Sequence, residues 1–81
     1  MIDDGDLRLM ILGCFRYSLG RRTYMPSTTV NVILNNEHLF NKQDWSKFIE
    51  EIDECKDLGS QCDIQTWNRL RDASINKSFV N

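Results

Sequence analysis

The residues best suited to recognition chemistry lie in one run near the N-terminus. This run brings three arginines and both tyrosines of the chain within nine positions, and we name the five residues the basic–aromatic corner: Arg16, Tyr17, Arg21, Arg22 and Tyr24. A guanidinium group binds phosphate or carboxylate through two parallel hydrogen bonds, and arginine and tyrosine are enriched at binding hot spots. The run therefore predicts a recognition surface. A helix end with solvated arginines is the competing interpretation, and the sequence leaves it open.

A second candidate surface is acidic. Residues 37–58 contain seven acids and three lysines, and we name five acids along a predicted helix the acidic helix face: Asp44, Glu50, Glu51, Glu54 and Asp57. A surface of this charge could occupy a basic nucleic-acid channel on another protein, and its field would speed the encounter. The alternative is that these carboxylates only keep the chain soluble.

Patterns for catalysis or metal binding are missing from the sequence. The chain has one histidine, His38, no serine in a G-x-S-x-G turn and no glycine-rich phosphate loop. The three cysteines, Cys14, Cys55 and Cys62, form no C-x-x-C pair and give no convincing zinc ligand set. We therefore expect a non-enzymatic protein without metal or cofactor. Cys14 and Cys55 are expected to be buried free thiols in a reducing cytoplasm.

Size and composition indicate one small globular domain. The chain has 81 residues, of which 41% are hydrophobic and 27% charged, and it contains one proline. Its net charge of −2 argues against a general nucleic-acid binder, which is usually basic. The N-terminus is acidic and no apolar run reaches transmembrane length, so we expect no membrane partner.

A four-residue apolar spacing predicts the helix that carries the basic–aromatic corner: Leu7, Ile11, Phe15 and Leu19. Asp6 is its expected N-cap, and Gly20 is expected to end it in a left-handed conformation. The three arginines of the corner would then converge at the helix C-terminus, where their charge complements the exposed carbonyls. Gly13 lies inside the helix, and we expect it to admit a neighbouring helix.

Three further elements complete the predicted fold. A helix is expected from Pro26, although the β-branched residues that follow it leave a strand over 27–35 open. A third helix is expected from the N-cap Asn41 to Leu58–Gly59, and its core-facing residues recur at three- and four-residue intervals: Trp45, Phe48, Ile49, Ile52 and Cys55. Asp63 is the expected cap of a fourth helix, whose pattern fades after Ala73.

The predicted fold is all-α, a small bundle of three to four short helices in a single domain over residues 1–81. Fraying of residues 1–5 and 74–81 is left open. The expected core is built on four aromatic residues: Phe15, Trp45, Phe48 and Trp67.

Two segments also carry a family resemblance. The run R-Y-S-L-G-R-R-T-Y, residues 16–24, resembles the R-Y-A-L-G-R-x-T-Y signature of small uncharacterised proteins encoded by bacteriophages. The segment L-G-S-Q-C-D-I-Q-T-W, residues 58–67, is similar to their L-G-x-x-C/S-D-x-x-x-W segment, and the resemblance as a whole covers roughly residues 7–72. Ser18 is a departure, since alanine is commoner there. The resemblance implies a phage origin but no settled activity, so no catalytic residue is carried over.

Three functional hypotheses follow. The leading one is a small non-enzymatic phage protein that acts in the host bacterial cytoplasm. It would bind and block a host defence component or host enzyme, as anti-CRISPR proteins do. The alternative is sequestration of a nucleotide or cyclic nucleotide signal through Arg16, Arg21 and Arg22, with a homodimer supplying the pocket walls. The third is a phage accessory regulatory protein. Direct nucleic-acid binding is not expected, because the fourth helix carries only two arginines.

Overall fold

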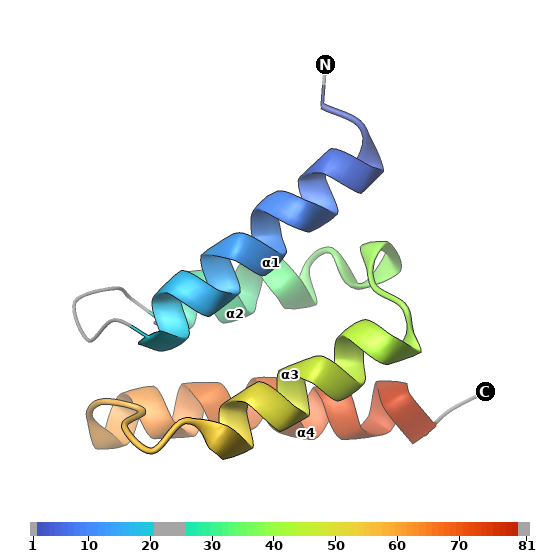
Figure 1. Cartoon of the computed structure of the whole chain (residues 1–81). Coiled ribbons are helices and arrows are strands. Elements are labelled where there is room, and N and C mark those ends of the chain that lie inside the picture. The colour runs from blue at the N-terminus through green and yellow to red at the C-terminus, as the bar shows by residue number, and fades with distance from the viewer. Residues whose placement is uncertain (1, 21–25, 80–81) are drawn as a thin grey trace.

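Helices account for nearly all of the structure, a computed structural model that describes residues 2–20 and 26–79 (Figure 1). The elements are α1 (Asp4–Gly20), α2 (Pro26–Leu34), a short 3₁₀ helix η1 (Glu37–Leu39), α3 (Lys42–Glu54) and α4 (Gln61–Phe79). The described residues contain no strand, which confirms the all-α prediction and decides the ambiguity over 27–35 in favour of a helix.

Helix α4 contacts both α2 and α3. Helix α3 lies along α4, α2 also packs on α4, and α1 packs on α2 (Figure 1). As a result, the end of α1, the start of α2 and the connection between α3 and α4 lie at the same end of the molecule. Segments that are some 35 to 40 positions apart in the sequence therefore come together there.

Aromatic rings form the centre of the core. Phe15 on α1 lies edge-to-face against Phe48 on α3, with ring centroids 4.8 Å apart, and against Trp67 on α4, at 5.7 Å. Trp45 continues this cluster by contacting Phe48 at 5.4 Å. Such pairs contribute about 0.5–1.5 kcal/mol each beyond the area that they bury. All four aromatic residues of the expected core are buried, so that prediction is confirmed.

The predicted N-cap is correct for α3 and three residues too late for α1 and α4. α3 begins as predicted, with Asn41 and Asp44 in a reciprocal capping box. For α1, the cap is Asp3 and not Asp6, because the backbone N of Asp6 donates to Asp3 Oδ1 at 2.8 Å. For α4, the cap is Ser60 and not Asp63: Asp63 N donates to Ser60 Oγ (3.3 Å) and Ser60 N donates to Asp63 Oδ2 (3.1 Å). In both helices the predicted cap is the residue three positions after the actual one.

Helix ends also differ from the prediction. α1 ends at Gly20 as expected, but the left-handed glycine of the described residues is Gly59, with φ of 92°. α3 ends at Glu54, before the predicted end at Leu58–Gly59, because the chain becomes extended at Cys55. α4 continues past Ala73 to Phe79. The buried Ser74 hides the periodicity there, since its hydroxyl is satisfied by the Leu70 carbonyl at 2.7 Å.

Two sequence expectations, buried cysteines and close helix packing against Gly13, are wrong. Cys14 is exposed and Cys55 only partly buried, although both are free thiols as expected. Gly13 does not admit another helix of this chain, because a Cβ built on it meets nothing within 4 Å. The errors at Gly13 and Cys14 arise because the inward face of α1 is centred on Ile11 and Phe15. Cys55 follows the last residue of α3, where the chain becomes extended and leaves the helical spacing.

Candidate functional site

The basic–aromatic corner is only partly described. Arg21, Arg22 and Tyr24 lie outside the described residues, so their convergence stays a prediction. Arg16 and Tyr17 are exposed on the last turns of α1. The guanidinium of Arg16 is directed to α3, where its Nε lies 3.4 Å from Glu51 Oε1. The one arginine of the corner whose position is described therefore contacts a carboxylate.

Asp44 does not belong to the acidic helix face, contrary to the prediction. It is buried, and its carboxylate accepts hydrogen bonds from Arg8 Nε (2.8 Å), the Arg8 terminal nitrogen (2.5 Å) and the backbone N of Asn41 (3.1 Å). The hydrogen bonds from Arg8 hold the pKa of Asp44 below its ordinary value, and Asp44 raises the pKa of Arg8 in turn. Asp44 thus joins α3 to α1 and starts α3, which are structural roles.

The other four members of the acidic helix face differ in exposure and in ion pairing. Glu51 is partly buried and pairs with Arg16. Glu50 and Glu54 are exposed, and neither forms an ion pair with a residue that the structure describes. Asp57 is exposed on the α3–α4 connection, where its Oδ1 accepts from Gly59 N at 3.1 Å. Only part of the predicted face therefore presents carboxylates to a partner.

Arg16 and Glu51, one residue of each candidate surface, meet at one end of the bundle. The Arg16–Glu51 ion pair joins the last turns of α1 to α3. Beside this pair is a shallow groove lined by residues from both elements: Arg16, Leu19, Gly20, Glu51, Glu54 and Cys55. This contact was not predicted from the sequence, because Arg16 and Glu51 are 35 positions apart and belong to two segments that were interpreted as separate surfaces.

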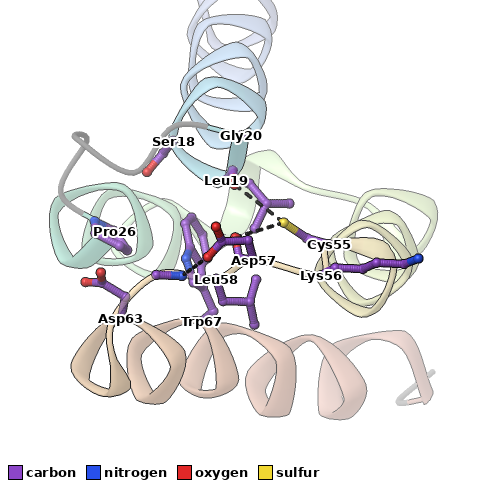
Figure 2. Close-up of a pocket in the computed structure, with 11 residues that line it drawn as sticks. Ser18, Leu19, Gly20, Pro26, Cys55, Lys56, Asp57, Leu58, Asp63 and Trp67 are labelled. Atoms are coloured by element: carbon purple, nitrogen blue, oxygen red, sulfur yellow. Dashed lines mark hydrogen bonds between the residues drawn. The ribbon is translucent and has the colours of Figure 1, made fainter.

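A cavity of about 330 Å³ lies at the same end, between the end of α1, the start of α2 and the α3–α4 connection (Figure 2). Leu19, Pro26, Leu58 and Trp67 provide apolar lining. Its polar lining includes a thiol, a hydroxyl and two carboxylates: Cys55, Ser18, Asp57 and Asp63. Figure 2 shows the ammonium group of Lys56 pointing away from both carboxylates.

Two polar groups that line this cavity, the Cys55 thiol and the Ser18 hydroxyl, differ in their hydrogen bonding. The Cys55 thiol contacts the carbonyl oxygens of Leu19 (3.6 Å) and Asp57 (3.4 Å), so it joins the end of α1 to the α3–α4 connection. The Ser18 hydroxyl is buried and finds no hydrogen-bond partner among the described residues. Sequence reasoning missed this cavity, although both segments of the phage-like resemblance contribute to it: Ser18, Leu19 and Gly20 from the first, and Leu58, Gly59, Asp63 and Trp67 from the second.

The described residues contain no cluster of three or more histidines, cysteines and acids that could hold a metal ion. In the same part of the chain, no helix combines the length and the apolar character needed to cross a bilayer. Among the described residues, the groups with clearly shifted pKa values form two ion pairs, Arg8–Asp44 and Asp53–Arg71. No family model, curated protein or solved structure matches this chain.

Proposed function

We propose that this chain is a small, non-enzymatic phage protein that binds and blocks a protein of its bacterial host in the cytoplasm, with Glu50 and Glu54 of α3 in the contact. The phage origin rests on the sequence resemblance. The contact surface rests on one observation, which is the uneven pairing of the acids of α3.

Three acids of α3 each contact an arginine. Asp44 pairs with Arg8 and Glu51 with Arg16, both on α1, whereas Asp53 pairs with Arg71 on α4. These pairs hold α3 to its neighbours.

Glu50 and Glu54 differ from these acids, since both are exposed and neither has an ion-pair partner in the described part of the chain. They lie four residues apart on one helix, an arrangement that costs about 0.2–0.5 kcal/mol for like charges. No ion pair with a described residue offsets this cost, which supports a role for the two carboxylates in binding a basic surface. Asp57, beyond the end of α3, extends the same charge toward the α3–α4 connection.

The test is capture of host proteins by the immobilised chain, with identification by mass spectrometry. We expect a host protein with a basic surface, whose retention falls as salt rises and is lost with Glu50→Lys or Glu54→Lys. Asp72→Lys is the matched control, because Asp72 is an exposed acid on α4 and its reversal changes the net charge equally. Equal loss with all three variants, or retention with Glu50→Lys and Glu54→Lys, would exclude this contact surface.

The nucleotide alternative has weaker support. The cavity at the end of α1 is lined by the carboxylates of Asp57 and Asp63, which disfavour a phosphate there, and the guanidinium of Arg16 contacts Glu51. A nucleotide that copurifies with the chain from infected cells and is lost with Arg21→Ala would reverse this ranking.

A further inference from the structure

The outer side of α1 is apolar although it faces away from the core. Leu9 is 61% exposed, Met10 55% and Tyr17 53%. Val32 of α2 adds exposed apolar surface, and a narrow groove of about 170 Å³ runs between Met10 and α2. A surface helix normally places polar residues on its outer side, so a contiguous apolar strip of this kind marks an interaction surface.

Gly13 lies in the middle of this strip. With 100° between successive residues, the exposed residues Asp6, Gly13 and Gly20 fall in one row along the helix. Leu9 and Arg16 flank the row on one side, and Met10 and Tyr17 flank it on the other. A Cβ at Gly13 would meet nothing within 4 Å, so glycine is not needed for packing within the chain. It does let another helix backbone come close from outside.

On the outer side of α1 the charges have opposite signs on the two sides of Gly13, because Arg8 is turned away to Asp44 of α3. Asp3, Asp4 and Asp6 lie at the start of α1, and Arg16 lies near its end. Arg16 contacts Glu51 of its own chain, but 68% of its side chain stays exposed. A second copy of α1 running antiparallel across Gly13 places the acidic start of each helix beside the basic end of the other, whereas a parallel copy places like charges together. The pattern is therefore complementary to itself in one orientation only, as a two-fold symmetric interface requires.

We infer that this chain forms a homodimer through α1, with two antiparallel copies of the helix crossing at Gly13. In this arrangement Met10 of one copy lies level with the partner's Tyr17, and methionine packs well against aromatic rings. Asp6 lies about one turn, roughly 6 Å, along the axis from the level of the partner's Arg16, within reach of its side chain. The interaction is separate from the proposed host contact, because it uses neither Glu50 nor Glu54.

Sedimentation equilibrium of the full chain from low to high micromolar concentration tests this directly. The wild type is expected to dimerise, and Gly13→Lys is expected to raise the Kd by roughly tenfold or more. Because the space outside Gly13 is open, this variant should keep its helical circular dichroism. Asn76→Lys is the matched control, an exposed position on α4 where the same charge should leave the Kd unchanged.

Orientation is tested by exchanging charges. The exchange is made in a Glu51→Gln chain, so that the loss of the Arg16–Glu51 pair is common to all variants. There, Asp6→Arg and Arg16→Asp should each weaken the dimer, and the double variant should recover the Kd of the Glu51→Gln chain. A short bis-maleimide should join two copies through Cys14, which is exposed beside Gly13, in a Cys62→Ser chain but not in a Cys14→Ser chain.

Three results would overturn the inference. One is a wild type that stays monomeric at high micromolar concentration, including a monomer whose α1 instead binds a host protein. The second is a dimer that Gly13→Lys does not weaken. The third is a double charge exchange that does not recover affinity, which would exclude the antiparallel arrangement.

Discussion

Replacing Asp44 by asparagine should be among the most destabilising single-atom changes on α3. The carboxylate accepts three hydrogen bonds, two from Arg8 and one from the backbone N of Asn41, at 2.5–3.1 Å. Only 9% of the Asp44 side chain is exposed. An asparagine has nearly the same size, so the change removes the charge and one acceptor while leaving the core packing in place.

The expected loss is about 2 kcal/mol in the free energy of unfolding. A hydrogen bond to a charged group contributes about 1.5–3 kcal/mol, and two of the three bonds here involve two charged groups. The lower part of the range applies because Arg8 is 31% exposed and can reach water once its partner is neutral. For a domain of this size, that loss lowers Tm by about 8–16 °C.

The matched control is the Asp53–Arg71 pair, which has the same two-pronged geometry. Arg71 donates from Nε and a terminal nitrogen to the two oxygens of Asp53, at 2.7 and 3.2 Å, but the Asp53 side chain is 50% exposed. Such an exposed pair contributes little to stability, because water and salt screen the attraction between the two charges. Asp53→Asn changes the same atoms and the same charge, so the difference between the two variants measures the effect of burial.

Urea unfolding followed by fluorescence of the two buried tryptophans supplies the free energies. Double-mutant cycles with Arg8→Ala and Arg71→Ala then separate each ion pair from other effects of the substitutions. We expect the larger coupling energy for Arg8 with Asp44. A coupling for Asp53 with Arg71 that equals or exceeds it would refute the reasoning from burial.

The same pair predicts a pH dependence. Because the hydrogen bonds from Arg8 lower the pKa of Asp44, its contribution is fully present above the unfolded pKa, about 3.9, and is lost as the pH falls through the folded pKa. The Tm difference between wild type and Asp44→Asn should be constant near neutral pH and shrink below about pH 4. A difference that persists unchanged in strong acid would show that the charge of Asp44 is not its source.

Four further substitutions test the local structure. Gly59→Ala should lower the free energy of unfolding by about 1–3 kcal/mol, because φ is 92° and a Cβ would lie 2.6 Å from Asp63 Oδ2. Gly13→Ala, at an open helical site, should leave the free energy of unfolding unchanged or raise it by up to about 1 kcal/mol. Urea unfolding measures both. Ser60→Ala should cost about 1 kcal/mol by removing the cap of α4, measured as faster amide hydrogen exchange in its first turn. Ser18→Ala should raise stability by about 1 kcal/mol in the same urea assay, because it removes a buried hydroxyl without a partner among the described residues; a loss would show that the hydroxyl is satisfied in solution.

Hydrophobic spacing predicted most of the fold. The stripe of α3 and the inward residues Phe15 and Trp67 were recognised because a helix that packs on a core repeats its apolar residues every three or four positions. Helix boundaries were less accurate for a physical reason. At the start of both α1 and α4, two polar residues that could cap the helix lie three positions apart. The first of the two is the cap, because its side chain accepts a hydrogen bond from the backbone N of the second.

The candidate site could not be assembled from spacing. Arg8 received no role from the sequence, because its partner lies 36 positions away and the contact depends on how α1 and α3 are oriented. The cavity has the same origin, since Ser18 and Trp67 meet only after the bundle has formed. Periodicity predicts which side of a helix faces inward, but it does not identify the particular residue that it meets.

This limit affects how the acidic charge of α3 should be interpreted. Helix α3 contains five acids that cannot be told apart from the sequence alone: Asp44, Glu50, Glu51, Asp53 and Glu54. In the fold, three of them pair with arginines of α1 and α4. Reversing the charge of the whole helix would therefore break contacts between helices, and lost binding would then report unfolding. Only Glu50 and Glu54 can be reversed without removing an ion pair among the described residues. Binding experiments restricted to these two positions can separate partner recognition from stability.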